Sequence, residues 1–262
     1  MKCAMRFSVL ASGSSGNVCY VESSDTRLLI DAGLSARETE RRLEQIGIKP
    51  SSLSAIIITH EHLDHVKGAG ALSRRYDLPL YINHDTFLNA QKTLGKISRP
   101  MIVQTGEALE INNLVVETFT KCHDAADPIG LIVSVDGIRI GVATDLGRST
   151  RLVEDRLRGC RALILEFNHD TVMLDEGPYP LFLKKRIKGR DGHLSNDQAG
   201  DLLETVCNKG LGHLVLAHLS EINNSPDIAY QRAAEVLTGC GIKTTEVLVS
   251  CQDEAAPMIE LT

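Results

Sequence analysis

The chain has 262 residues, of which 43% are hydrophobic and 24% charged, and its net charge is −6 at pH 7. This composition is typical of globular proteins, and no run approaches the 18 or so apolar residues of a membrane-spanning helix. The negative charge argues against a general affinity for nucleic acid, although it can hide a local basic patch. Seven scattered cysteines without a C-x-x-C pair, and an N-terminus without an apolar signal region, favour a reduced cytoplasmic protein.

Alternating apolar runs and amphipathic spacing predict strands and helices along the whole chain. In chain order, we expect strands at 6–10, 17–22 and 26–31, a helix at 36–46, a strand at 55–59, a helix at 66–76, a strand at 79–82, a helix at 85–94, several strands between 101 and 143, a helix at 149–158, a strand at 161–167, helices at 180–187 and 195–209, a strand at 213–217, a helix from 226 to about 238 and a strand at 244–250. Such interleaving indicates the α/β class, with helices covering sheets. Because no linker, charge block or repeat interrupts the pattern, we expect one domain over residues 1–262.

Short local signals mark where some of these elements begin and end. Ser35 and Glu38 have the spacing of a capping box, and Gly47 supplies a helix stop. Asp136-Gly137 is a hairpin signal, and the Gly-Ser-Ser-Gly-Asn run at 13–17 predicts a turn.

Three histidines and one aspartate lie within six residues, directly after the apolar strand 55–59: His60, His62, Asp64 and His65. Imidazole nitrogens and carboxylate oxygens are the ligands expected for zinc, manganese or iron. A lone histidine is more often a packed core residue, but this density is hard to explain by packing, since buried polar groups are costly. The four side chains cannot all converge on one point. The sequence therefore predicts two divalent metal ions that share this turn.

Three further polar residues also follow apolar strands. His123 comes after the strand 114–120, Asp145 after 140–144 and His218 after 214–217. Each alone could be an ordinary loop residue, but their common placement favours additional metal ligands, and a carboxylate at position 145 could bridge two ions.

The H-x-H-x-D-H motif at 60–65, preceded by Asp31-Ala-Gly33 and followed in order by His123, Asp145 and His218, resembles the metallo-β-lactamase superfamily over essentially the whole chain. The resemblance implies an αββα sandwich, in which two mixed sheets pack face to face with helices outside and metal ions at one sheet edge. It also implies a role for each residue: His60, His62 and His123 would bind the first ion, Asp64, His65 and His218 the second, Asp145 would bridge them, and Asp31 would orient a ligand through hydrogen bonds.

The same resemblance implies hydrolysis by a metal-bridging hydroxide, with Asp64 and His193 as catalytic residues. The segment from Gly192 to Ser220 is similar to the closing segment of transfer-RNA 3′-processing nucleases, where the histidine matching His193 is a candidate proton donor to the leaving oxygen. Capping of the helix that begins at Ser195 is the alternative role for His193. The long arm of those nucleases and the β-CASP insertion of related RNA-cleaving enzymes are not found in the sequence.

Four stretches, at 10–17, 166–174, 192–196 and 218–226, most closely resemble the YycJ/WalJ group of bacterial metallo-hydrolases, which implies DNA exonuclease activity from 5′ ends. Residues in these stretches are candidate substrate contacts, with turns and structural caps as the alternatives: Ser12, Ser14, Ser15, Asn17, Asn168, His169, Asp170, Ser195, Asn223 and Asn224.

The substrate itself stays open at this point. The basic run 184–190 could contact a phosphate backbone or be a solvated helix end. With 4% aromatic residues and no Trp, any DNA would be held mainly by its backbone. A small-molecule hydrolase acting on a thioester, lactone or cyclic phosphodiester is one alternative, and a metal-bearing binding protein with little turnover is another. A homodimer is compatible with the sequence.

Overall fold

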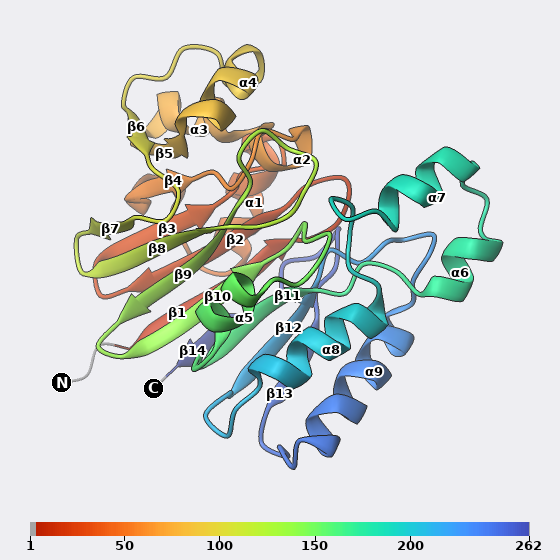
Figure 1. The fold of residues 1–262 in the computed structure, drawn as a ribbon. Helices are drawn as coiled ribbons and strands as arrows, with labels where there is room; N and C mark the ends of the chain where they lie inside the picture. Colours follow the sequence, from red (N-terminus) through yellow and green to blue (C-terminus); the bar gives the residue numbers. More distant parts are fainter. Residues whose placement is uncertain (1–3, 262) are drawn as a thin grey trace.

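Two seven-stranded sheets pack face to face in the computed structural model, which describes residues 4–261 (Figure 1). The first sheet has the strand order β14-β1-β2-β3-β4-β5-β6, and it consists of β1 (Met5–Ala11), β2 (Val18–Ser23), β3 (Thr26–Ile30), β4 (Ala55–Ile57), β5 (Leu80–Asn83), β6 (Pro100–Val103) and β14 (Ile259–Leu261). The second has the order β13-β12-β11-β10-β9-β8-β7, and it consists of β7 (Ala108–Ile111), β8 (Leu114–Thr120), β9 (Ile129–Val135), β10 (Ile138–Ala143), β11 (Ala162–Glu166), β12 (His213–Ala217) and β13 (Glu246–Val249).

Helices cover the outer face of each sheet. The first sheet packs against α1 (Ala36–Gln45), α2 (Leu63–Val66), α3 (Ala69–Tyr76) and α4 (His84–Leu94). The second packs against α5 (Arg151–Leu157), α8 (Asn196–Val206) and α9 (Pro226–Gly239). Two short helices, α6 (Thr171–Glu176) and α7 (Leu181–Ile187), stand out at the side of the molecule (Figure 1). The order helix, sheet, sheet, helix confirms the αββα sandwich expected from the resemblance.

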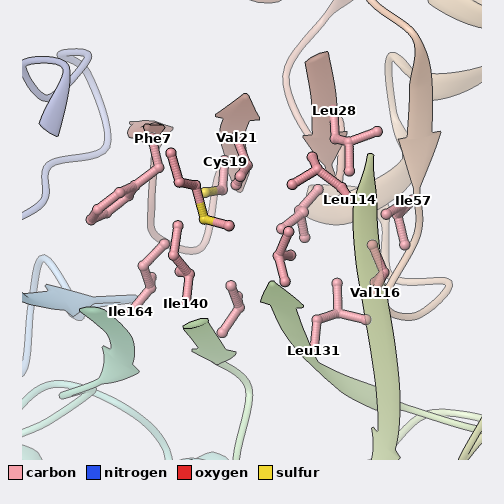
Figure 2. Packing of buried hydrophobic residues seen from close by; sticks show 14 of the residues in the cluster. Phe7, Cys19, Val21, Leu28, Ile57, Leu114, Val116, Leu131, Ile140 and Ile164 are labelled. Atoms are coloured by element: carbon pink, nitrogen blue, oxygen red, sulfur yellow. The ribbon is translucent and has the colours of Figure 1, made fainter. Parts of the chain in front are cut away.

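The main core lies between the sheets. Figure 2 shows Phe7, Leu28 and Ile57 of the first sheet on one side and Leu131 and Ile164 of the second on the other. Side chains of a strand alternate between its two faces. Each sheet therefore contributes one apolar face to this core and turns the other toward its own helices.

Strand direction brings several strand ends to the same rim. In the first sheet β3 to β6 run parallel, and in the second β10 to β13 run parallel. Because β8 and β10 are both antiparallel to β9, β8 also points the same way as β10. The segments after β4, β8, β10 and β12 are the ones from which the sequence predicts metal ligands, and the loop after β3 carries Asp31, which was expected to orient a ligand.

Several local predictions need correction. The helix expected at 66–76 is two helices separated at Gly68, where an added Cβ would lie 2.3 Å from the carbonyl oxygen of Leu34. Ser35 caps α1, but the Glu38 carboxylate binds Arg41 and Arg42 and does not complete a capping box. The helix α6 and the strand β14 were not predicted from the sequence.

The sequence also predicted reduced cysteines and no membrane-spanning helix. Cys19, Cys122, Cys160, Cys207, Cys240 and Cys251 are free, and Cys3 lies outside the described residues. None of the helices within residues 4–261 combines the length and the apolar character needed to cross a membrane.

The inter-sheet core gives a stability prediction. Leu131 is fully buried between the sheets, so Leu131→Ala should lower the free energy of unfolding by about 2–5 kcal/mol through lost burial and a residual cavity. Leu88→Ala, at a leucine that is 50% exposed, is the matched control and should change it by about 0.5 kcal/mol or less. Urea unfolding of both variants measures this, and equal losses would contradict the packing described here.

Candidate metal centre

The rim gathers all seven predicted ligand side chains from both sheets. They come from the loop after β4 (His60 and His62), from α2 (Asp64 and His65), and from the loops after β8 (His123), β10 (Asp145) and β12 (His218). Two groups consist of predicted ligands only: His60, His62 and His123 form the first, and Asp64, His65, Asp145 and His218 form the second. Within each group the potential ligand atoms lie within 4.8 Å of one another. A third group of this kind combines Asp145 and His218 with Glu166 and His193.

Hydrogen bonds to carbonyl groups orient the rings of the first group. His123 Nδ1 lies 3.2 Å from the Gly192 carbonyl oxygen, and His62 Nε2 lies 3.2 Å from that of Asp124. A ring N–H that donates to a carbonyl leaves the other ring nitrogen with a free lone pair. Those other nitrogens, His62 Nδ1 and His123 Nε2, are 3.3 Å apart and face each other.

His60 is oriented in the same way through a hydroxyl group. The Thr59 hydroxyl donates to Asp31 at 2.8 Å, so it accepts from His60 Nδ1 at 3.0 Å. This leaves His60 Nε2 buried without a hydrogen-bond partner among the protein atoms described.

Asp145 lies between the two groups. Its Oδ2 is 3.3 Å from His65 Nε2, and its Oδ1 is 3.3 Å from His218 Nε2 and 3.9 Å from His123 Nε2. Asp64 Oδ2 is 3.4 Å from His65 Nε2. One carboxylate therefore reaches both groups, as expected of a residue that bridges two ions.

Two buried carboxylates support the ligands from behind. Asp31 accepts from His65 Nδ1 at 2.8 Å, and its other oxygen accepts from the Thr59 N–H at 2.8 Å. Glu166, at the end of β11, lies with Oε1 3.2 Å from His218 Nδ1 and 2.7 Å from His193 Nδ1. Each carboxylate fixes which nitrogen of a ligand histidine keeps its proton, so that the other nitrogen faces the rim.

Backbone strain accompanies this arrangement. Asp31, Asp145 and His218 have positive φ angles of 59°, 54° and 57°. Non-glycine residues rarely adopt this left-handed region, which costs free energy and is often found at functional sites. The backbone at Gly33 also lies very close to that of Asp64, because an added Cβ at Gly33 would lie 1.5 Å from the Asp64 carbonyl oxygen.

Charge in the site is strongly coupled to burial. Burial alone would lower the pKa of His65 and His218, but neighbouring carboxylates, above all Asp145, outweigh it: the pKa of His65 rises well above its usual value and that of His218 rises to about 10. Burial would raise the pKa of Asp145, but His218 and His65 hold it well below its usual value. The carboxylates thus favour positive charge in the site. Without a bound metal ion, protonated imidazole rings supply that charge.

These residues fit a divalent metal ion. His60 Nε2, His218 Nε2 and Asp145 Oδ2 are buried atoms without hydrogen-bond partners in the described chain. A buried polar atom without a hydrogen-bond partner costs free energy, and a metal ion bound among such atoms in place of the imidazole protons would offset that cost. Nitrogen and carboxylate oxygen donors are the set preferred by zinc and similar ions.

The site opens into a cleft of about 230 Å³. Of the ten candidate substrate contacts, Ser14 and Asn168 line it. Tyr179 and Ser220, which were not predicted as contacts, line it as well, and so does Arg186 of the basic run 184–190, for which a phosphate contact was one interpretation. Asn168 also donates to the His218 carbonyl oxygen at 2.9 Å, which ties the cleft wall to a predicted ligand.

The other candidate contacts do not line this cleft. Most of them are buried or cap a helix: Ser12 accepts from the His218 N–H, Asn17 donates to Asp64, Asp170 caps α6, Ser195 caps α8, Asn224 pairs with Asn196, and His169 and Asn223 are buried. The backbone N–H groups of Gly13, Ser15, Gly16 and Asn17 donate hydrogen bonds within the protein.

His193 and Glu166 form a hydrogen-bonded pair, of which the sequence predicted only His193 as a site residue. Ser195 caps α8 with a complete capping box, so His193 is not the cap, and its ring lines the cleft. Glu166 was not predicted as a site residue. The available signal was a carboxylate at the end of an otherwise apolar strand, the same signal that indicated Asp145. Burial would raise the pKa of Glu166, but His193 and His218 lower it to about 2.

Four layers with histidine and aspartate groups at one rim define a metallo-β-lactamase fold, and comparison with known proteins agrees. Residues 26–219 match the family model described as a beta-lactamase superfamily domain, and the chain belongs to this family. The crystal structure of the metallo-beta-lactamase fold protein YhfI from Bacillus subtilis is similar over 99% of this chain and 100% of that one, with a TM-score of 0.75 and 18% identity.

Two curated relatives match almost end to end. The chain is 36% identical to exodeoxyribonuclease YycJ of Bacillus anthracis over 92% of each protein. It is 35% identical to exodeoxyribonuclease WalJ of Streptococcus pneumoniae serotype 2 (strain D39 / NCTC 7466) over 98% of each.

The contacts of Asp31 give a prediction about metal affinity. Asp31→Asn keeps a residue type that tolerates a left-handed backbone but loses the carboxylate that accepts from His65, so the affinity for manganese should fall about 10- to 100-fold. Titration against a competing chelator measures this. Asp155→Asn, on the exposed side of α5, is the control, and equal affinities in both variants would remove Asp31 from the supporting contacts.

Proposed function

We propose that this protein is a metal-dependent exodeoxyribonuclease that holds two divalent ions, zinc or manganese, and degrades DNA from 5′ ends. The observation that carries the proposal is the pair of adjoining ligand groups at the floor of an open cleft. Near full-length relatives named exodeoxyribonucleases support the choice of DNA over other substrates.

Each ion has a ligand set. His60, His62 and His123 would hold the first, Asp64, His65 and His218 the second, and Asp145 would contact both. Divalent ions bound there supply an activated water near neutral pH and positive charge beside the reacting phosphate.

His193 is placed to protonate the leaving oxygen. Its Nδ1–H donates to the Glu166 carboxylate at 2.7 Å, and its ring lines the cleft beside Asp64 and His218. The buried Glu166 carboxylate holds this ring in place by accepting from Nδ1–H. A protonated His193 would donate from Nε2, which is the role that an alkoxide leaving group requires.

Arg186 supplies a cation on the opposite wall of the cleft. It extends from α7, lines the cleft and pairs with Asp124 through Nε at 2.6 Å. The ion pair uses one edge of the guanidinium group, and the remaining N–H groups are available for a phosphate oxygen.

A cleavage assay tests the proposal. Manganese-loaded wild-type protein should degrade 5′-labelled duplex DNA, whereas Asp64→Ala should not and should bind fewer than two manganese ions. Asp155→Ala, purified identically, controls for the loss of an exposed aspartate and should retain activity. If the wild type, with metal bound, matches Asp64→Ala on DNA but hydrolyses a thioester, lactone or cyclic phosphodiester, the protein is a small-molecule hydrolase instead.

The role of His193 gives a separate prediction. His193→Ala should keep both ions and slow turnover of DNA by roughly 10²- to 10⁴-fold, the range typical of a lost general acid. The defect should be much smaller on a p-nitrophenyl phosphodiester, whose leaving group needs no proton. Metal content and the two rates are measured together, and an equal defect on both substrates would refute proton donation.

A further inference from the structure

The helix α7 has two different faces. One face, with Leu183, Arg186 and Ile187, lines the cleft of the metal centre. At 100° per residue, the side chains on the opposite face are those of residues 181, 184, 185 and 188. These four side chains and Asp175 of α6 line a second groove. We call it the lysine groove, and its lining residues are Leu181, Lys184, Lys185, Lys188 and Asp175.

The lysine groove carries more positive than negative charge. Lys184 Nζ donates to the backbone oxygen of Asp175 at 2.7 Å, and Lys188 pairs with the Asp175 carboxylate. Lys185 has no ion pair or side-chain hydrogen bond within residues 4–261. One carboxylate thus faces three ammonium groups, in a chain whose net charge is −6.

Core packing does not explain α7. The helix has no buried residue, and its Leu181 and Phe182 are 67% and 74% exposed, the highest values among the large apolar side chains described. The helix is nevertheless fixed relative to the site. The His193 N–H donates to the Ile187 carbonyl at 2.9 Å, and Arg186 pairs with Asp124, whose own carbonyl accepts from His62.

We propose that the lysine groove binds the phosphate backbone of the DNA strand, a few nucleotides from the phosphate that lies at the metal centre. This inference rests on the proposed nuclease function. A helix with its side chains is about 10 Å across, which exceeds the axial spacing of about 3.4 Å between neighbouring phosphates of one strand. A strand that crosses α7 from the cleft to the lysine groove therefore spans more than one nucleotide.

Ammonium groups suit this role because backbone contacts require charge and not base recognition. A lysine that neutralises a phosphate releases a bound counterion, which makes the affinity depend on salt. The groove would give affinity for any strand long enough to reach it, independent of sequence. It would also favour strands over dinucleotides, which end before they reach the groove.

Salt-dependent binding tests the inference. The probe is a fluorescent 20-nucleotide single strand with a hydrolysis-resistant phosphorothioate backbone, and anisotropy with manganese-loaded protein gives Kd from 50 to 200 mM NaCl. Relative to wild type, the triple variant Lys184→Gln/Lys185→Gln/Lys188→Gln should have a log Kd against log salt slope that is shallower by about 2, because each lost contact removes about 0.7. Its Kd at 50 mM should rise about tenfold or more.

Two further variants make the result decisive. Lys185→Gln breaks no contact within the described protein and should lower the slope by about 0.7. This variant therefore tests the role of the lysine groove even if the triple variant does not fold. Lys209→Gln/Lys243→Gln is the matched control, because these exposed lysines precede β12 and β13 at the end opposite the metal centre, and it should bind as the wild type does.

The outcomes separate this inference from the proposed function. Folded lysine variants with the slope and Kd of wild type, or a wild type that does not bind the strand, would overturn the role of the lysine groove. Cleavage of an unmodified 5′-labelled strand by wild type is measured in parallel. Cleavage together with unaltered binding by the lysine variants would overturn the groove alone, whereas binding without cleavage would overturn the nuclease and leave the groove as a strand-binding site.

Discussion

The rest of the structure depends on a buried gathering of imidazole nitrogens and carboxylate oxygens at the rim where the two sheets end. The buried atoms His60 Nε2, His218 Nε2 and Asp145 Oδ2 make no hydrogen bond within the described chain. Buried polar atoms cost free energy unless a hydrogen bond or a cation compensates them. A metal ion bound among these atoms would offset that cost, and the left-handed backbone at Asp145 and His218 is a further cost of the arrangement.

Two buried carboxylates behind the candidate ligands orient the histidine rings. Asp31 in the first sheet and Glu166 in the second each accept from the nitrogen of a ligand histidine that points away from the rim. Glu166 also accepts from His193, so one side chain orients both a predicted ligand and the proposed acid. Under the proposed function, this shared partner would couple metal binding to proton donation, because a change in Glu166 would disturb both.

The cleft of the candidate metal centre takes a second wall from α7, a helix that contributes nothing to the buried core. Its attachment to Asp124 and His193 fixes a basic surface at a set position relative to that centre. Under the proposed function, this arrangement would let an acidic protein act on a polyanion, because positive charge is confined to the path of one strand and is not spread over the surface.

The sequence by itself determined the α/β class and the candidate ligands, because alternating strand and helix patterns, a dense H-x-H-x-D-H run and polar residues after apolar strands are local signals. The αββα sandwich was implied by the family resemblance, and the structure confirmed it. Only the tertiary structure showed that Glu166 lies behind His193 and His218, since those residues meet across loops distant in the chain. It likewise decided that Ser195 caps a helix and that the basic run on α7 faces two different grooves. Whether a polar side chain caps, supports or lines a cleft depends on what folds against it, and spacing along the chain does not carry that information.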